Sequence, residues 1–566
     1  MGWTVEDAPW WTRAVVYQVY PRSFADSDGD GVGDLRGITA HVDHLADLGV
    51  GAVWLSPVYA SPQVDNGYDI SDYDDIDPVF GTMADFDELV GALHDRGIRL
   101  VMDLVVNHTS DEHPWFASSR ASREDRRRDW YVWRPARAGH EPGTPGAEPT
   151  NWGSFFGGPT WTYDEGTGEY YLHLFASSQP DLNWENPQVR AEVYAMMNRW
   201  VDRGVDGFRM DVVNLISKDQ SFGDGPVRAD GLGDGSAYYV SGPRIHEFLA
   251  QMHQEVFAGR DGVFLTVGEM PGVTVEQARV FTDPARREVD MVFDFEHMGL
   301  DRGPGGKFDV RTLRLTDLKA TLGRWQTGLA DVGWTSLYWD NHDQPRICSR
   351  WGDGIPASAK ALATVLHLHR GTPYVYQGEE LGMTNAGLTS LDDYQDIESL
   401  NYAAAALAQG TDEAQVLASL AAMGRDNART PMQWDASEHA GFTTGTPWLP
   451  VNPNHTTINV AAQRDDPHSV LSHYRRLVTL RREDATVALG RFDMLLGDDE
   501  HVYAFTRTLA DDRLLVVANL TAKARQVDLG EDLTAATLVL TTHPGTVLDG
   551  PVLHLRGWEA VVVRLA

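Results

Sequence analysis

The chain has 566 residues, 42% hydrophobic and 23% charged, which are the proportions of a soluble globular protein with one large core and smaller attached units. Its 82 acidic and 47 basic residues give a formal net charge of -35; much of this excess serves solubility, but it also excludes nucleic acid and anionic membranes as partners and leaves a small neutral molecule. No apolar stretch is long enough to cross a bilayer, the N-terminus lacks the regions of a signal peptide, and the single Cys348 cannot form an intrachain disulfide, so we expect a cytoplasmic protein.

Eight short runs rich in β-branched and aromatic residues alternate with amphipathic helical stretches, which is typical of repeated βα units. The runs cover residues 15–21, 52–57, 99–108, 207–213, 264–270, 292–295, 336–343 and 373–380. Eight such units close a barrel, so we predict the α/β class and a (β/α)8 TIM barrel.

An inserted subdomain is predicted after the third run, because about a hundred residues separate it from the fourth and one βα unit needs far fewer. Residues 134–171 are rich in glycine, proline and aromatic residues, and helical spacing resumes after the Asn-Pro pair at 186–187. We assign residues 108–178 to this subdomain and residues 1–107 and 179–487 to the barrel.

A second excursion is expected after the eighth run, over residues 383–453, before a helix around residues 473–482. From residue 490 onwards the pattern changes to strand-like segments separated by turns. We therefore predict a C-terminal antiparallel β domain over residues 488–566.

Three acidic residues, Asp211, Glu269 and Asp343, each lie at the end of a predicted strand, and in a parallel barrel these ends carry the chemistry. Arg209 lies two residues before Asp211, on the same strand face, and would keep that carboxylate ionised. Glu269 ends an apolar run, where desolvation would keep it protonated. One such acid alone is more often a buried structural residue, but three at matching positions indicate a site. A charged and a neutral carboxyl group about 5 Å apart are what a retaining glycosidase requires.

Five ordered motifs resemble the signature regions of the α-amylase superfamily of glycoside hydrolases (family 13). They are D-L-V-V-N-H (103–108), Q-P-D-L-N (179–183), G-F-R-M-D-V-V-N (207–214), V-G-E-M (267–270) and N-H-D (341–343). Within this superfamily, the sequences of residues 179–187, 267–274 and 425–434 are similar to those of the oligo-1,6-glucosidase and α-glucosidase group. The resemblance covers roughly the whole chain. It implies an exo-acting, retaining α-glucosidase that releases glucose from short α-glucosides, prefers α-1,6 links and is compatible with transglycosylation.

The resemblance also implies roles for individual residues. Asp211 would be the nucleophile, Glu269 the general acid/base and Asp343 a third carboxylate that holds the sugar hydroxyls. His108, Arg209 and His342 match residues that hydrogen-bond the sugar in the innermost subsite.

The closed end of the pocket is implied in the same way. Asp65 and Tyr68 match a carboxylate and a stacking aromatic residue there, and Arg429 is the expected partner of Asp65, with Arg425 as the competing candidate. Val212, directly after the nucleophile, matches a position where valine accompanies α-1,6 and threonine α-1,4 activity. A plain β-branched strand residue would explain Val212 equally well.

Residues 26–34, D-S-D-G-D-G-V-G-D, have acids at alternate positions, a spacing that suits a hard cation with oxygen ligands. The EF-hand glutamate at the twelfth position is absent, since Gly37 stands there. Asp26, Asp28, Asp30, Asp34 and the carbonyl of Val32 match a calcium loop of the resembling group. We expect a structural Ca²⁺ and no organic cofactor; a solvated acidic turn is the alternative.

Other functions stay open at this point. An α-1,4-glucosidase or a sucrose hydrolase or isomerase is the nearest alternative, but sucrose isomerases carry R-L-D-R-D where residues 299–303 read G-L-D-R-G. A non-catalytic transporter subunit would need a membrane helix, and a phosphate site in the acidic G-D-G-V-G-D stretch would repel its ligand. We take the chain to be a monomer that acts on a small neutral oligosaccharide or disaccharide.

Overall fold

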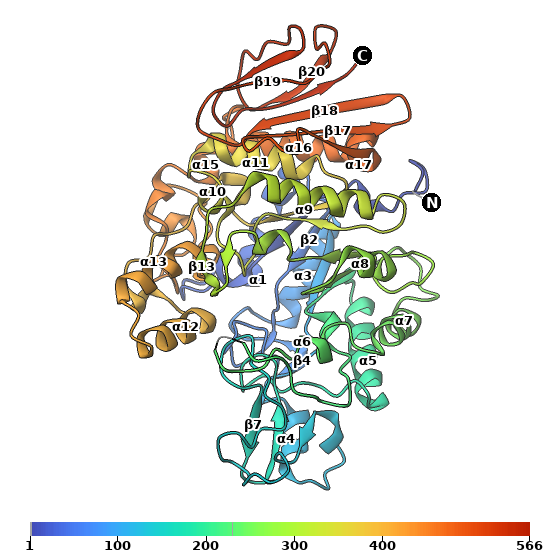
Figure 1. Ribbon diagram of the computed structural model, residues 1–566, viewed down its shortest axis with the longest axis vertical. Coiled ribbons are helices and arrows are strands. Elements are labelled where there is room, and N and C mark those ends of the chain that lie inside the picture. Colours follow the sequence, from blue (N-terminus) through green and yellow to red (C-terminus); the bar gives the residue numbers. More distant parts are fainter. Residues whose placement is uncertain (1–2, 229) are drawn as a thin grey trace.

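The computed structural model describes residues 3–228 and 230–566 (Figure 1). Eight strands form its central sheet: β1 (Val16–Val19), β2 (Ala52–Leu55), β5 (Arg99–Leu104), β9 (Gly207–Met210), β10 (Leu265–Glu269), β11 (Met291–Phe293), β14 (Ser336–Leu337) and β15 (Thr372–Tyr376). Their order is β11-β10-β9-β5-β2-β1-β15-β14, and every neighbouring pair is parallel. A parallel bridge between Val292 and Thr335 joins the two outer strands. The predicted TIM barrel is therefore confirmed.

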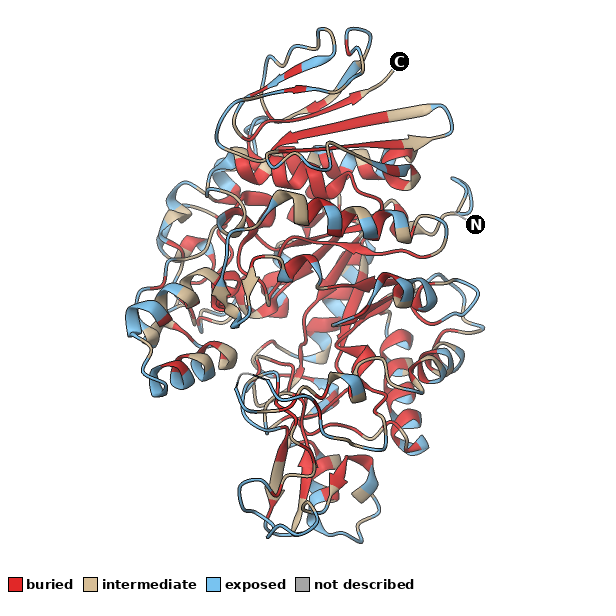
Figure 2. Cartoon of the chain, viewed as in Figure 1, coloured by how far each residue is buried: buried red, intermediate tan, exposed pale blue. Residues whose placement is uncertain are grey.

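The observed strands are shorter than predicted at their C-terminal ends, because the motifs continue into loops that carry the polar residues. The seventh strand shows this most clearly, since only Ser336 and Leu337 of the predicted run 336–343 are paired in the sheet. Figure 2 shows that the barrel strands are buried almost throughout; Arg99, the first residue of β5, is half-buried. Buried strands fix the starting points of the loops, and the loops present the side chains.

Helices cover the outside of the barrel. They are α1 (Leu35–Ala40), α2 (Val42–Leu48), α3 (Met83–His94), α5 (Pro187–Asp202), α7 (Ile245–Val256), α8 (Val275–Phe281), α9 (Leu315–Gly328), α10 (Ile347–Arg350), α11 (Pro356–His367), α16 (Val470–Glu483) and α17 (Ala485–Leu489). The short helix α6 (Ser236–Tyr239) packs instead on Trp152 of the inserted subdomain. Helix α5 shows why they form where they do: the side chain of Asn186 caps it by accepting a hydrogen bond from the amide of Gln188, and Pro187 occupies the first turn. Its buried face includes Val189, Val193 and Trp200, which pack on the core.

The inserted subdomain lies at the end of the molecule opposite the C-terminal domain (Figure 1). It contains α4 (Pro114–Ala121) and an antiparallel sheet of β6 (Trp133–Arg134), β8 (Glu169–Leu172) and β7 (Trp161–Asp164). Its apolar cluster includes Trp152 and Trp161 and extends to Val212 and Leu215 after strand β9. The subdomain is thus packed directly against the loop that follows Asp211.

Two short hairpins, β3 (Tyr59–Ala60) with β4 (Asp72–Ile76) and β12 (Arg302–Gly303) with β13 (Gly306–Val310), complete this end of the barrel. The second excursion is helical and contains α12 (Ile397–Ala408), α13 (Glu413–Met423) and α14 (Asp426–Arg429), and α15 (Val460–Gln463) follows it.

The C-terminal domain is antiparallel, as predicted. Its strands are β16 (Arg491–Leu495), β17 (Val502–Leu509), β18 (Asp512–Asn519), β19 (Arg525–Asp528), β20 (Thr537–Thr541), β21 (Val552–Leu555) and β22 (Ala560–Arg564), with one sheet in the order β16-β17-β18-β22-β20 and β19 paired with β21. The larger sheet packs on α11 and α17 (Figure 1). Within the described part of the chain, no helix combines the length and the apolar character needed to span a membrane.

Candidate active site

The three predicted acids line one pocket at the C-terminal end of the barrel, with a volume of about 300 Å³. Asp211 directly follows β9, Glu269 is the last residue of β10, and Asp343 lies in the loop after β14. The other lining residues are Asp65, Tyr68, His108, Phe155, Phe156, Phe175, Val212, Pro271, Phe295, Arg302, Lys307, His342, Gln344, Glu398 and Arg425. The barrel, the inserted subdomain and the second excursion all contribute to it.

Arg209 joins two of the acids. Its Nη1 lies 2.6 Å from Oδ1 of Asp211, and its Nη2 lies 2.7 Å from Oε1 of Glu269. Nη1 also contacts Oδ1 of Asp103 at 2.9 Å. The sequence predicted that Arg209 and Asp211 share one strand face, but no role was predicted for Asp103. Asp103 could have been noticed as an acid inside an otherwise apolar strand. In the structure it lies opposite Arg209 in the register of β5 and β9.

The protonation states of the two acids differ. Burial raises the pKa of Glu269 well above its usual range, with the charges of Asp211 and Asp343 adding to the rise and Arg209 opposing it. Burial also raises the pKa of Asp211 to about 6, although Arg209 opposes the rise. Burial therefore outweighs the guanidinium at Asp211, contrary to the sequence-based expectation, yet at neutral pH this carboxylate is still mostly ionised. The pair can supply a nucleophile and a proton donor at the same time.

Val212 adopts a left-handed backbone conformation, with φ 36° and ψ 38°, which is strained for a β-branched residue. This turn directs its amide to Oε2 of Glu269, at 2.9 Å. The Val212 side chain lines the pocket. Val212 is therefore a residue with a specific backbone geometry, and not an ordinary strand residue.

Asp343 is held by three neighbours. His342 Nε2 lies 3.2 Å from its Oδ2, and both Arg425 Nη1 and Arg429 Nη2 lie 3.0 Å from its Oδ1. Although burial opposes the effect, His342, Arg425 and Arg429 hold the pKa of Asp343 well below its usual range. Asp343 therefore remains an ionised hydrogen-bond acceptor.

The partner of Asp65 is Arg425, so the prediction of Arg429 is wrong. Arg425 Nη2 lies 3.1 Å from Oδ1 of Asp65, whereas Arg429 contacts Asp343, Asp396 and the carbonyl of His342. The two arginines are four residues apart. Arg425 directly precedes α14 and Arg429 ends it, and this difference in position decides which one faces the pocket. Arg425 lines the pocket and Arg429 lies fully buried behind it.

Tyr68, His108 and His342 lie together at this end of the pocket. The Tyr68 ring stacks on His342, with centroids 5.1 Å apart, and its hydroxyl donates to Oδ2 of Asp103 at 2.8 Å. His108 Nε2 lies 3.0 Å from the carbonyl of Tyr68. Burial lowers the pKa of His342 to about 3 and lowers that of His108 too, so both rings are neutral hydrogen-bonding groups.

Several pocket residues had no signal in the sequence analysis. Lys307, from β13, places its Nζ 2.5 Å from Oε2 of Glu398, from α12. Phe155, Phe156 and Phe175 come from the inserted subdomain and form an aromatic wall, with Phe155 stacked on Phe175 at 5.0 Å. All five lie in irregular or inserted segments, where no strand pattern marks the direction of a side chain.

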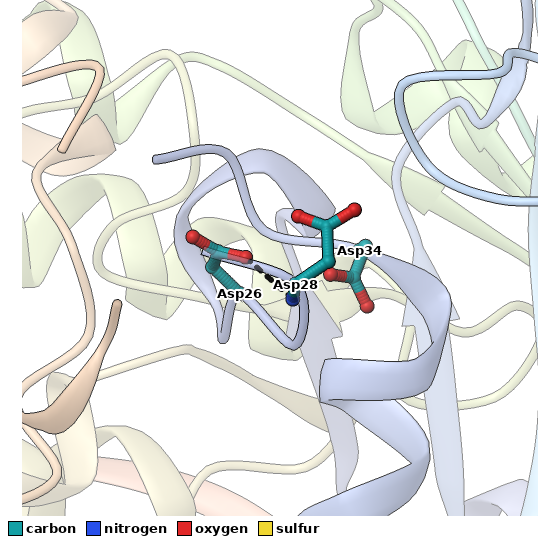
Figure 3. A group of neighbouring side chains, drawn as sticks. All are labelled: Asp26, Asp28 and Asp34. Atoms are coloured by element: carbon teal, nitrogen blue, oxygen red, sulfur yellow. Dashed lines mark hydrogen bonds between the residues drawn. The ribbon is translucent and has the colours of Figure 1, made fainter. Parts of the chain in front are cut away.

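The acidic loop before α1 brings three of its predicted ligands together. Asp26, Asp28 and Asp34 each offer a carboxylate oxygen within 4.8 Å of the others (Figure 3). Asp30 lies outside this group, and its carboxylate accepts a hydrogen bond from the amide of Val32 at 2.8 Å. Three hard oxygen donors at this spacing fit a divalent cation.

This loop is far from the three acids in sequence and is fixed to the end of the second excursion. The amide of Asp26 donates a hydrogen bond to the carbonyl of Phe442 at 2.9 Å. The amide of Trp448 donates one to the carbonyl of Gly31 at 3.0 Å. A cation here would stabilise the packing of residues 26–34 on residues 442–448.

The chain is similar to known proteins over both its catalytic region and its C-terminal domain. The sequence matches the family model of the α-amylase catalytic domain over residues 18–490 and that of the C-terminal domain of the α-amylase SusG over residues 502–562. It is 54% identical over 564 residues to the oligo-1,6-glucosidase of Parageobacillus thermoglucosidasius, covering 98% of this chain and 99% of that protein.

Two solved structures show the same arrangement of the whole chain. A variant of trehalose-6-phosphate hydrolase from Bacillus licheniformis superimposes with a TM-score of 0.94 at 45% identity, covering 99% of this chain and all of that one. An isomaltulose synthase variant from Erwinia rhapontici, in complex with sucrose, gives 0.93 at 40% identity over 98% of this chain and 99% of that one.

Proposed function

This chain belongs to the α-amylase family of glycoside hydrolases, and we propose that it is an exo-acting, retaining α-glucosidase. In this proposal it releases glucose from the non-reducing ends of short α-glucosides, prefers α-1,6 links and transfers glucose to other sugars as a side reaction. The observation that carries it is that the carboxyl groups of Asp211 and Glu269 line a single pocket and both contact Arg209; burial raises the pKa of both, and that of Glu269 well above its usual range.

The mechanism uses each acid twice. Asp211 attacks the anomeric carbon while Glu269 protonates the departing glycosidic oxygen, and a glycosyl ester forms on Asp211. Glu269, now ionised, removes a proton from a water molecule, which attacks the same carbon and frees Asp211. The side chains of Asp211 and Glu269 are in hydrogen-bonding contact, far closer than the spacing that an inverting enzyme needs for a water molecule, which favours retention over inversion.

The inner end of the pocket supports exo action. Asp65 and Arg425 form an ion pair there, and Arg425 also reaches Asp343. In this proposal the ion pair closes this end, so that a bound sugar ring meets charged hydrogen-bonding groups and no further subsite. The enzyme therefore removes one terminal glucose at a time.

Lys307 and Glu398 also line the pocket and support a neutral substrate. They form an ion pair, with Arg425 Nε 3.6 Å from Oε2 of Glu398, and they offer a donor and an acceptor to hydroxyl groups. The oligo-1,6-glucosidase at 54% identity and Val212 beside the nucleophile support α-1,6 preference.

The test is a turnover comparison on isomaltose, panose, maltose, sucrose and trehalose 6-phosphate, with the anomer of the released glucose followed by NMR. We expect α-glucose and the highest kcat/KM on isomaltose or panose. Release of β-glucose, or cleavage inside a long dextrin, would refute the proposal. A preference for maltose or sucrose would support the α-1,4-glucosidase or the sucrose hydrolase or isomerase alternative.

We also propose that Asp26, Asp28 and Asp34 hold a structural Ca²⁺, with the carbonyl of Val32 as a further ligand. Bound there, the cation would neutralise the carboxylates and fasten the loop. A monomeric state and a cytoplasmic location are proposed as well; the buried single thiol of Cys348 suits a reducing compartment. Size-exclusion chromatography with light scattering tests the monomer.

A further inference from the structure

A second pair of acids lies behind the active site. Asp340 and Glu379 are 2% and 3% exposed, and neither lines the pocket. Asp340 stands three residues before Asp343, and Glu379 begins the short helix η6 (Glu379–Leu381) after strand β15. Their side chains are in hydrogen-bonding contact with each other.

Each member of the pair also has an oxygen without a donor. Asp340 Oδ2 accepts from the amide of Ile347 at 3.0 Å, and Glu379 Oε1 accepts from the hydroxyl of Tyr474, in α16, at 2.6 Å. The remaining oxygens, Oδ1 of Asp340 and Oε2 of Glu379, find no hydrogen-bond donor among the described residues. Two buried carboxylates cannot face each other when both are ionised, so one proton must lie between them.

The charged neighbours do not replace that proton. Arg346 donates to the carbonyls of Gln377 and Ala428, and although burial raises the pKa of Asp340 overall, the charge of Arg346 lowers it only in part. Glu380 is satisfied by Tyr17, His44 and the amide of Gly378. The other titratable groups nearby are the thiol of Cys348, which lies in α10, the hydroxyl of Tyr376, and His367, whose ring meets Tyr474 edge-on.

We propose that Asp340 and Glu379 share one proton and that this acid pair positions His342 and Asp343. Residues 341–344 form a turn, closed by the bridge between Asn341 and Gln344, and His342 and Asp343 lie in its centre. Asp340 closes the stem of this turn through the amide of Ile347 and fastens it to the next strand end through Glu379. Only the effect on substrate binding rests on the proposed function, in which Asp343 binds the sugar.

Loss of the shared proton at high pH should therefore weaken substrate binding. At alkaline pH two negative charges would be in buried contact, and the stem of the turn would move away from Glu379. Asp343 would then leave its contacts with Arg425 and Arg429, and substrate binding would weaken. A glutamine at position 379 can donate through its amide at every pH, so it keeps the contact without a titrating proton.

Infrared spectroscopy tests the shared proton without any assay of activity. In the difference spectrum of wild type minus Glu379→Gln at neutral pH, we expect the carbonyl stretch of a protonated carboxyl group. Protonated Glu269 is present in both proteins and cancels. Asp290→Asn is the matched control, because Asp290 is a buried acid at the opposite end of the barrel, where it accepts from Thr266. A difference spectrum without that band would overturn the shared proton.

Kinetics test the positioning. Glu379→Gln should keep kcat/KM within about threefold of wild type near neutrality and lose less activity than wild type at alkaline pH. Glu379→Ala should raise KM and lower kcat/KM at least about tenfold, as expected when a buried partner is left unsatisfied. If the alanine variant does not fold, Asp340→Asn, which keeps both contacts without a titrating proton, should reproduce the behaviour of Glu379→Gln. A glutamine variant as impaired as the alanine variant, or one with the wild-type alkaline limb, would overturn the positioning role; a failed glucosidase assignment would leave the infrared result unchanged.

Discussion

The backbone amide of Val212 donates a hydrogen bond to Oε2 of Glu269 at 2.9 Å, so the residue that follows one acid holds the other. The left-handed backbone of Val212 makes this contact possible. The position can therefore influence linkage preference in two ways, through its side chain on the pocket wall and through the placement of Glu269.

Val212→Thr should shift the substrate ranking towards maltose. Threonine keeps the β-branched shape and the backbone conformation but exchanges a methyl group for a hydroxyl near the leaving sugar. We expect the ratio of kcat/KM on isomaltose to that on maltose to fall by about 10- to 100-fold, which corresponds to about 1–3 kcal/mol. Val212→Ile is the control that keeps an apolar wall. An unchanged ratio in the threonine variant would remove Val212 from the account of linkage preference.

Removing either acid should separate the two chemical steps. Asp211→Asn should abolish turnover of every glucoside, because no nucleophile remains. Glu269→Ala should lose about 10²- to 10⁴-fold on isomaltose but far less in the first step with a p-nitrophenyl glucoside, whose leaving group needs no proton. Added azide should then restore turnover and give α-glucosyl azide. A β-product would contradict the retaining mechanism.

The pH profile of kcat/KM should be bell-shaped. Asp211 must be ionised to attack, and its pKa is raised to about 6, so activity falls as the pH drops below about 6. Glu269 must hold a proton, and its pKa is raised well above the usual carboxyl range, so activity falls again as the pH rises through that value. Glu269→Gln should lose the alkaline limb that belongs to this acid. An acid limb near the ordinary carboxyl range would show that Arg209 outweighs burial at Asp211.

Arg425 and Arg429 should have different effects. Arg425 faces the pocket and pairs with Asp65, so Arg425→Lys should raise KM for isomaltose by about 10- to 100-fold, as expected for one lost charged hydrogen bond. Both arginines pair with Asp343 and Asp396, but Arg429 is fully buried outside the pocket lining and also donates to the carbonyl of His342, so Arg429→Lys should lower thermal stability more. Melting curves beside the kinetics separate the two. Equal losses of stability in both variants would count against a binding role for Arg425 alone.

The sequence predicted the barrel and the positions of its acids because strand ends carry local signals. Asp211, Glu269 and Asp343 each follow an apolar run, and alternation along the strand placed Arg209 beside Asp211. The choice between Arg425 and Arg429 failed because both lie in an excursion without strand periodicity, where a difference of four residues decides which side chain reaches Asp65.

Lys307, Glu398 and the three phenylalanines were missed for the same reason: their positions depend on how inserted segments pack over the barrel. The acid pair of Asp340 and Glu379 was hidden in a different way. Asp340 adjoins a recognised motif, but only the three-dimensional structure brings Glu379 to it from the next strand end.

Calcium should raise the melting temperature. A ligand that binds only the folded state stabilises it by about 2.7 kcal/mol at a hundred times its Kd, so we expect a shift of a few degrees on adding Ca²⁺ and its reversal by EDTA. The double variant Asp26→Asn, Asp28→Asn should lose that response while its kcat stays close to wild type, because the loop packs on residues 442–448 and does not line the pocket. Asp30→Asn is the matched control, since its carboxylate lies outside the group of three. A calcium response that survives in the double variant would place the cation elsewhere.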